Sequence, residues 1–272
     1  MALLTVLPDP STKRSYWGAE DASGDVGPGF ASVKLTSDQK VMLSRTNSQR
    51  VIARSAGGQK WNIDINYNPM TRAEFTPVYT FLLQQRGALT PFFVKLPQYA
   101  SSQNALFNTD TNESGDATYN TNTFATYAIQ PAGATSVLLT QPTDWKLKNA
   151  AGADITDDTQ EPFNIPAVGD VFTWLDTNDT NHKKVYMVTY VETYYKYNVQ
   201  PSPAAGTNPD ASVDPRRIRL GITPPLARSV ASTATATFKD VQFKVVLPRA
   251  VQEYSLGTDN LYKFNLKLEE YV

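Results

Sequence analysis

Residues 59–87 read QKWNIDINYNPMTRAEFTPVYTFLLQQRG, and they contain the clearest secondary-structure pattern in the chain. Its first part alternates strictly between apolar and polar side chains over residues 60–67. The apolar positions are Trp61, Ile63, Ile65 and Tyr67, and the polar ones are Asn62, Asp64 and Asn66. Such alternation predicts a strand that buries one face and exposes the other. A helical pattern follows at once, so the stretch predicts a strand that leads into a helix.

One helix is predicted over residues 71–86. Its apolar residues have the spacing of a single helical stripe. They are Phe75, Val78, Tyr79, Leu82 and Leu83. Thr71 opens a capping box, and Gly87 is a natural stop. Pro77 leaves two starts open. With Thr71 as the cap, the proline lies inside the helix and should kink it; with Thr76 as the cap, it takes the first helical position.

The rest of the chain is predicted to be mainly β. Further strands are expected from alternating or apolar runs at 34–43, 91–97, 136–140, 143–147, 169–174, 184–195, 218–222, 240–247 and 261–271. The turn-rich residues 8–32 predict an extended N-terminal arm or long loop. Residues 98–160, rich in Thr, Asn, Ser, Ala and Asp, predict mostly exposed loops. Short strands separated by turns, with one helix, define the fold class.

The C-terminal strands have the amphipathicity needed to complete a sheet begun in residues 33–97. In the last strand the side chains expected on the apolar face are Tyr262, Phe264, Leu266, Leu268 and Tyr271. The predicted organisation is one β domain formed by residues 1–97 and 238–272, which carries helix 71–86. Residues 98–237 form an inserted β domain, a small barrel or sandwich of its own. Insertion at a loop is tolerated because chain termini often lie close together.

Composition and charge exclude several classes of function. The chain has 272 residues, a mass of 30.0 kDa and a formal net charge of -1, which argues against a dedicated nucleic-acid binder. The absence of cysteine excludes disulfides, thiolate metal sites and cysteine nucleophiles. His182 is the single histidine, so one chain cannot form a multi-histidine metal site. No run approaches the roughly 18 apolar residues of a membrane span. The short apolar start predicts mature protein made in the cytosol, not a signal peptide.

The segment 176–184 is the first candidate for chemistry. His182 could belong to a catalytic triad or bind a metal, but its polar surroundings between two strong strands favour an exposed hairpin turn. No Gly-x-Ser-x-Gly elbow supplies a nucleophile. The alternate spacing of a calcium loop is also present, at Asp176, Asn178 and Thr180. A calcium loop nevertheless needs Gly where Asn181 stands and a bidentate Glu where Met187 stands.

An acidic cluster is the second candidate. It comprises Asp154, Asp157, Asp158 and Glu161. Paired carboxylates can hydrolyse glycosides or bind a hard cation. Here the surroundings are the most polar of the chain, which makes it hard to raise the pKa of one carboxyl by desolvation. A solvated loop is therefore the interpretation, and no catalytic, cofactor-binding or metal-binding residue is assigned.

A basic cluster and a tyrosine cluster indicate binding or packing surfaces, and not catalytic sites. The basic cluster is Arg216, Arg217 and Arg219, which could meet phosphate or an acidic neighbour. Gly57 and Gly58 lack the Lys-Ser/Thr that a phosphate loop requires. The tyrosine cluster is Tyr186, Tyr190, Tyr194, Tyr195 and Tyr197. Tyrosines can stack on sugars or pack against another subunit; core or interface packing is favoured over ligand binding.

The stretch 59–87 resembles a recurrent segment of tailed-bacteriophage tail proteins. In those proteins a strand with an aromatic start leads into a P-M-T-R-x-E-F turn, then a helix, then x-x-R-G before another strand; this chain has PMTRAEF at 69–75 and QQRG at 84–87. Other segments are similar to the inserted β-barrel and the C-terminal part of such proteins, namely VGDVF at 168–172, KVYMVT at 184–189, ITPPL at 222–226, VQEY at 251–254 and LYKF at 261–264. Residues 98–165 resemble nothing in the family.

The resemblance implies a tail-tube-like β-barrel or sandwich with one flanking helix. It further implies a structural protein of the virion, at the distal end of the tail, as a tube-terminating, distal-tail or baseplate-hub adaptor protein. Such proteins form rings, so a homohexamer is expected. The implied partners are further copies, the tail-tube protein and baseplate or hub proteins, with DNA only as cargo passing through the lumen. No enzymatic activity, cofactor or membrane insertion is implied.

Two hypotheses from other classes stay open. A carbohydrate-binding module could contact host-surface glycan through the tyrosine-rich insertion. A carboxylate-based glycosidase could use residues 154–161.

Overall fold

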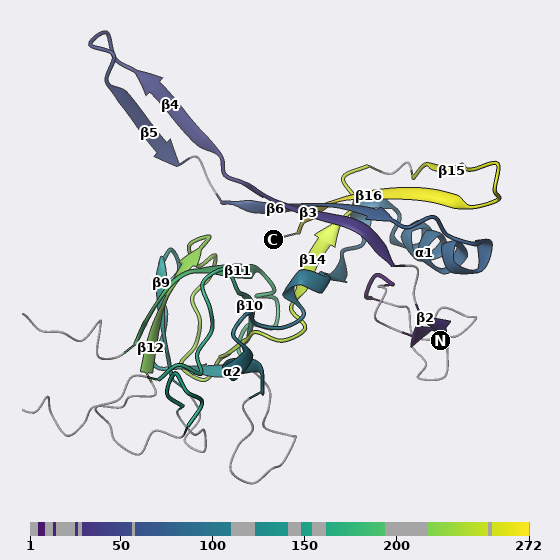
Figure 1. Cartoon of the computed structure of the whole chain (residues 1–272). Coiled ribbons are helices and arrows are strands. Elements are labelled where there is room, and N and C mark those ends of the chain that lie inside the picture. Colours follow the sequence, from purple (N-terminus) through teal and green to yellow (C-terminus); the bar gives the residue numbers. More distant parts are fainter. Residues whose placement is uncertain are drawn as a thin grey trace, which may run out of the picture. The chain divides into compact units, whose positions relative to one another are not determined.

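A computed structural model describes residues 5–8, 13–14, 25–26, 29–55, 58–109, 123–140, 148–153, 162–193, 217–249 and 252–271. The chain separates into two compact units (Figure 1). Unit 1 consists of Met1–Leu96 and Gln242–Val272, and unit 2 of Pro97–Val241. Both are built mainly from strands, so the predicted mainly β class is confirmed.

Unit 1 is an antiparallel sheet with one helix. Its elements are β1 (Lys13–Arg14), β2 (Asp25–Val26), β3 (Phe30–Asp38), β4 (Val41–Arg45), β5 (Val51–Ser55), β6 (Lys60–Tyr67), α1 (Arg72–Gln85), a 3-10 turn (Gly87–Leu89), β7 (Phe92–Lys95), β14 (Gln242–Val246), β15 (Tyr254–Leu256) and β16 (Tyr262–Glu270). The main sheet has the order β3-β6-β16-β14-β7, and β15 pairs with β16. Because β16 lies between β6 and β14, the C-terminal strands complete the sheet begun by β3 and β6, as their amphipathicity predicted.

The sheet buries one face only. Along β6 the four apolar side chains are buried, which confirms the predicted alternation, and along β16 Phe264, Leu266 and Leu268 are buried. The last part of β16 differs from the prediction, because Glu270 is buried and Tyr271 is exposed. Strict alternation puts position 270 on the inner face, and its carboxylate is used there to accept the Trp61 N–H (3.2 Å).

Helix α1 covers the buried face. The Thr71 N–H donates to the Glu74 carboxylate (2.8 Å), so Thr71 is the cap. Pro77 then lies inside the helix, which resolves the alternative left open by the sequence. The end is as predicted, since Arg86 takes a left-handed conformation (φ 53°) just before Gly87. The buried side of α1 is rotated from the predicted stripe: Phe81 is buried and Leu83 is exposed.

Strand β3 ends at Asp38, and a second, separate ribbon follows it. Residues 34–43 were predicted as one strand; instead the chain breaks at 39–40 and pairs anew as β4 with β5. The register requires this break. Asp38 pairs with Lys60 and Val41 with Ser55, so one side of the junction is two residues longer than the other. Residues 41–55, here called the arm, thus form a hairpin beyond the end of the sheet (Figure 1).

Unit 2 contains a closed barrel. Its elements are a 3-10 turn (Pro97–Tyr99), α2 (Ala105–Thr109), β8 (Thr123–Thr126), β9 (Ser136–Thr140), β10 (Val171–Leu175), β11 (Val185–Thr193), β12 (Arg217–Thr223) and β13 (Thr235–Thr237). The order β10-β11-β12-β9-β8-β13 closes through the pairing of β13 with β10, which confirms an inserted small barrel. The elements α2, β8 and β13 were not predicted. The strand expected at 143–147 lies outside the described residues.

The barrel is filled by aromatic and aliphatic side chains. Rings from α2, β8, β10 and the segment after β13 meet near the centre, for example Phe107 and Phe124 (centroids 5.6 Å apart) and Phe172 and Phe238 (5.1 Å). All four are buried. α2 therefore supplies a core ring from a region that composition alone had marked as exposed loop.

Candidate functional site

The arm exposes apolar side chains on both of its faces. Five of them are between 49% and 70% exposed, namely Val41, Met42, Leu43, Val51 and Ile52. Leu43 pairs with Ala53 across the hairpin, whereas Ser44 pairs with Ile52, so successive pairs point to opposite faces. Among the described strands, β4 and β5 pair only with each other. A lone two-stranded hairpin is marginally stable in water, and no other described strand covers the apolar side chains of this one.

The edge of the main sheet beside the arm is also open. Strand β3 is nine residues long and, within the described part of the chain, pairs only with β6. The opposite edge is different, because the N-terminal segment lies along β7: the Leu7 N–H donates to the Phe93 carbonyl (2.8 Å) and the Phe93 N–H to the Thr5 carbonyl (2.8 Å). Long unpaired edges invite pairing with another chain. One edge is therefore closed by the chain itself, and one is available.

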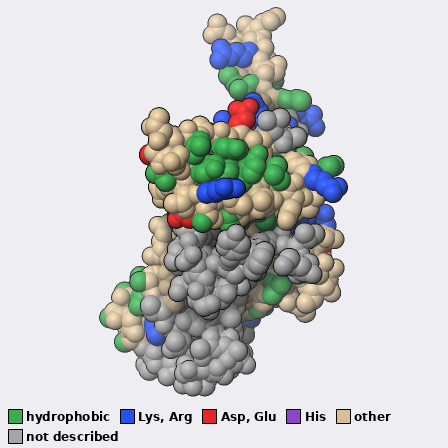
Figure 2. All heavy atoms as spheres, turned by 90° about the vertical axis from the view of Figure 1, so that its right-hand side faces the viewer, with side chains coloured by type: hydrophobic (Ala, Val, Ile, Leu, Met, Phe, Trp, Pro, Cys, Tyr) green, Lys and Arg blue, Asp and Glu red, His purple; other side chains and the backbone are tan. Residues whose placement is uncertain are grey.

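A second apolar surface lies where α1 meets β15. We call it the aromatic patch, and it consists of Tyr79, Leu83, Tyr254 and Leu256. The rings of Tyr79 and Tyr254 are 5.4 Å apart, and Leu83 and Leu256 are 53% and 54% exposed. Figure 2 shows hydrophobic side chains gathered on the side of unit 1 that carries α1 and β15. Beneath the patch, Phe75 stacks on Tyr262 (4.5 Å), so a packed aromatic layer fixes its position.

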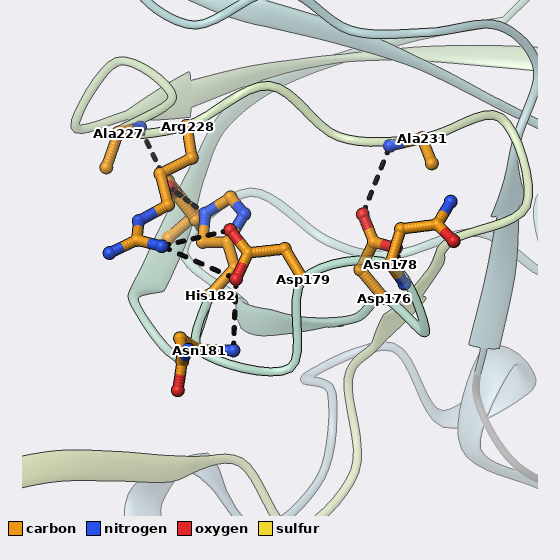
Figure 3. Close-up of polar contacts among 9 residues, drawn as sticks. Asp176, Asn178, Asp179, Asn181, His182, Ala227, Arg228 and Ala231 are labelled. Carbon is orange, nitrogen blue, oxygen red and sulfur yellow. Dashed lines mark hydrogen bonds and ion pairs between the residues drawn. The ribbon is translucent and has the colours of Figure 1, made fainter.

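His182 lies in the turn between β10 and β11, as predicted, but it is buried and not exposed (2%). Its Nε2 bonds the Tyr186 hydroxyl (2.7 Å), which also accepts the Ala227 N–H (3.0 Å). Figure 3 shows the turn against the segment 227–231. Polar residues in sequence indicated exposure, but the segment after β12 folds over the turn and covers the ring.

Burial lowers the pKa of His182 below its usual value, and the positive charge of Arg228 adds to this, although Asp179 opposes it. The imidazole Nδ1 is buried and has no hydrogen-bond partner among the described residues. A proton added there would carry a buried charge without an acceptor. The histidine is therefore suited to a neutral structural role and not to proton transfer.

The two aspartates of this turn hold main-chain groups. The Asp176 carboxylate accepts the N–H groups of Asn178 (2.8 Å) and Ala231 (3.1 Å). Asp179 accepts the Asn181 N–H (3.1 Å) and pairs with Arg228 (3.0 Å), and this pairing lowers the pKa of the Asp179 carboxyl (Figure 3). The alternate spacing that resembled a calcium loop thus belongs to a turn whose carboxylates cap backbone N–H groups.

Asp170 forms a polar centre that sequence reasoning missed. It is 3% exposed, and its carboxylate accepts the N–H groups of Gln103 (2.9 Å) and Ala167 (2.8 Å) and the hydroxyl of Ser102. These bonds join the start of β10 to the segment that precedes α2. The only signal was the Gly169-Asp170 pair at a strand start, which is typical of a turn.

The tyrosine cluster divides between core and surface. Tyr186 is fully buried inside the barrel, whereas Tyr190 is 41% exposed. The Tyr190 ring lies over Gly221, its cross-strand partner, so closely that a Cβ at this glycine would overlap the ring. Arg219 pairs with Glu192 beside it (2.6 Å from Nε). Tyr194, Tyr195 and Tyr197 lie outside the described residues.

The remaining candidates are only partly placed. Arg217 lies over the ring of Tyr127 (3.8 Å), which explains one member of the basic cluster, and Arg216 lies outside the described residues. So does the whole acidic cluster, Asp154, Asp157, Asp158 and Glu161. Within the described ranges, no three His, Cys, Asp or Glu side chains are grouped so that they could hold a metal ion. No helix there is long and apolar enough to cross a membrane.

No family model matches the chain, and a search of curated proteins finds no match.

Proposed function

We propose that this protein is a structural, non-catalytic component of the tail of a tailed bacteriophage, and that it forms a ring at the distal end of the tail. In this proposal the ring joins the tail tube to the baseplate or hub. The support from sequence is the resemblance of residues 59–87. These residues form β6 and α1, the strand and helix on which the whole of unit 1 is built.

The observation that carries the proposal is the open side of unit 1. Among the residues that the structure describes, strand β3 offers nine residues of unpaired edge, and the arm beside it exposes apolar side chains to water. In an isolated monomer both features are liabilities for aggregation. In a ring each copy presents two different surfaces to its two neighbours, and rotation closes the set. The β3 edge and the arm would then both form contacts between neighbouring copies.

The face of the sheet opposite α1 suits a water-filled lumen. It carries Asn62, Asp64 and Asn66 from β6 and Lys267 from β16, none of them buried. A mixed polar face of this kind tolerates water and DNA that passes without binding. The partners proposed are therefore further copies of the chain, most simply six, together with tail-tube and baseplate or hub proteins in the virion.

The test is assembly. Purified protein should elute from mass-resolved chromatography as a hexamer and show rings by electron microscopy. Added to purified tail tubes of its phage, it should label one end only. Protein that stays monomeric at every soluble concentration, and that never labels tube ends, contradicts the proposal.

A second candidate function is carbohydrate binding by the barrel of unit 2. The observation that favours it is Tyr190, a half-exposed ring held flat over Gly221 beside the Arg219–Glu192 pair. An aromatic face next to charged hydrogen-bonding groups can stack on a sugar. Binding on a glycan array that disappears in Tyr190→Ala supports it; equal binding by the variant removes it. Tyr186 has no part in this candidate because it is buried in the core.

A further inference from the structure

We infer that the outer wall of the barrel in unit 2 binds a neutral oligosaccharide, with Tyr190 and Tyr127 as two separate stacking platforms. This inference rests on the second candidate function, carbohydrate binding at Tyr190, and names its ligand class and a second contact. The wall is the outward face of β11, β12 and β9 (Figure 1), together with Tyr127, which follows the end of β8.

Tyr190 is the first platform. Gly221, its partner across β11 and β12, lies between the buried Leu220 and Ile222, so this position faces outward. A Cβ at Gly221 would come within 2.1 Å of the Tyr190 ring, so one face of the ring rests on the strand. The ring is 41% exposed, which leaves its other face to solvent. A ring held in this way can stack on the apolar face of a sugar.

Tyr127 is the second platform. Its N–H donates to the Leu138 carbonyl (3.0 Å), and Leu138 pairs with Arg219, so Tyr127 extends an outward row across β12 and β9. The ring is 45% exposed. The Arg217 guanidinium lies over it, 3.8 Å from the centroid. This cation–π contact holds the orientation of the ring while nearly half of its surface stays in solvent.

The distance between the platforms sets the size of the ligand. The register places Tyr127 two strands and two residues away from Gly221, on which the Tyr190 ring rests. At the spacings of a sheet this separation is roughly 12 Å. A single sugar ring cannot contact both tyrosines at that distance, whereas a chain of sugars can. The spacing therefore favours an oligosaccharide over a monosaccharide.

The polar groups between the platforms suit hydroxyl groups. Arg219 and Glu192 form an ion pair on the path from Gly221 to Tyr127, and the Arg219 Nε–H donates to the Glu192 carboxylate (2.6 Å). About a third of each side chain is exposed (35% and 32%). A guanidinium supplies only donors and a carboxylate only acceptors, and a sugar hydroxyl uses both. Because the two charges of the pair cancel, it favours a neutral sugar over an anion.

The charge of unit 2 argues against a polyanionic ligand. Residues 97–241 contain 10 Lys and Arg but 15 Asp and Glu. Such an acidic excess repels chains of phosphates or carboxylates. Single-stranded nucleic acid could also stack its bases on two tyrosines, but it needs a basic surface to hold its backbone. A neutral glycan meets no such repulsion.

The experiment begins with the ligand class and its length. The whole chain is screened on an array that carries oligomers of glucose, galactose, mannose, rhamnose, N-acetylglucosamine and uronic acids, each printed at lengths from one sugar to five. The strongest binder is then titrated by calorimetry at every length. We expect a neutral series, with an affinity that rises by about tenfold or more between the monosaccharide and the chains that reach Tyr127.

Two alanine variants separate the platforms. Tyr190→Ala should lose binding at every length, whereas Tyr127→Ala should bind the monosaccharide as wild type does and lose the gain with length. Tyr127→Phe keeps the ring and should keep the gain. The matched control is Phe163→Ala, which removes another ring of unit 2 with similar exposure (46%) from outside the wall and should change nothing. Circular dichroism and thermal unfolding check that each variant folds.

Each contrary result has a distinct meaning. Glycan binding that Tyr190→Ala abolishes but that Tyr127→Ala leaves unchanged at every length overturns the inference and keeps the second candidate function. The absence of any glycan binding overturns both, and leaves the proposed ring to its own test of assembly. A preference for uronic-acid oligomers, or binding of a labelled oligo-dT strand in place of neutral glycans, overturns the inference by showing a polyanion site.

Discussion

The two units differ in whether their outermost strands are paired. In unit 2 the six barrel strands each have two neighbours, so hydrogen bonding is complete within the chain. In unit 1 the sheet ends at β3, and the hairpin beyond it keeps its apolar side chains in water. The two units therefore differ in how far strand pairing within the chain satisfies their sheet edges. The barrel strands are all paired within one chain, whereas among the described residues unit 1 leaves the outer edge of β3 unpaired and the arm exposed.

The largest effect is expected at Asp170, whose carboxylate joins the start of β10 to the segment before α2. Asp170→Ala leaves two main-chain N–H groups and the Ser102 hydroxyl without their acceptor, so we expect a loss of about 4 kcal/mol in the free energy of unfolding. Urea denaturation followed by circular dichroism measures it. Asp170→Asn retains one acceptor oxygen and should lose less. A loss below about 1 kcal/mol for the alanine variant would show that the barrel does not depend on this carboxylate.

Two isoleucines, one in the main sheet and one in the arm, allow the packing of the two regions to be compared directly. Ile65 is fully buried on β6, and Ile52 is exposed on β5. Ile65→Ala should destabilise the protein by about 3 kcal/mol through the lost packing and the cavity. Ile52→Ala should change the monomer by less than about 0.5 kcal/mol. Denaturation at low protein concentration compares them, and equal losses would mean that the arm is packed within the monomer.

A smaller effect is expected at Gly221 on the barrel wall. A methyl group there displaces the Tyr190 ring, and we expect Gly221→Ala to cost about 1 kcal/mol. In the Tyr190→Ala background the same change should cost almost nothing, because the ring is gone. The matched control is Gly58→Ala in unit 1, where a Cβ would meet nothing within 4 Å. Additive losses in the double variant would contradict the contact.

The smallest effect is a pH dependence confined to unit 2. Burial lowers the pKa of His182 below the usual histidine value of about 6.5, so the unfolded chain takes up this proton at a higher pH than the folded chain does. The free energy of unfolding must then fall as the pH drops through 6.5 towards the lowered pKa. Since His182 is the only histidine, His182→Gln should flatten this part of the profile. An unchanged slope would show that the folded ring titrates normally.

Much of the fold could be predicted because it follows from alternation. The strands of 60–67 and 261–271 and the helix of 71–86 all have one apolar face, and the structure places them within a few residues of the prediction. The closed barrel was predicted less directly. The sequence of β8 and β13 is rich in Thr and Ala, which have no strong pattern, and only closure of the barrel makes them strands.

The candidate site was harder to predict, because exposure is set by tertiary packing. Met42 and Leu43 ended a predicted strand, and the sequence gave no indication that both side chains would be exposed to solvent. The signal that could have revealed the arm is two short apolar runs, 41–43 and 51–53, around the polar turn 46–50. Leu83 was likewise expected to be buried, since helical spacing alone does not fix which side of a helix meets the sheet. His182 shows the reverse error, a polar segment that distant residues bury.

The position of β16 inside the sheet orders the events of biosynthesis. Unit 2 is one continuous segment, and all of its residues are synthesised before β16 is made. The strands of the barrel are therefore all present in the chain before unit 1 has its central strand. The central strand of unit 1 arrives last, and until then β6 and β14 have no common neighbour. The main sheet of unit 1 can therefore be completed only when the chain has almost its full length.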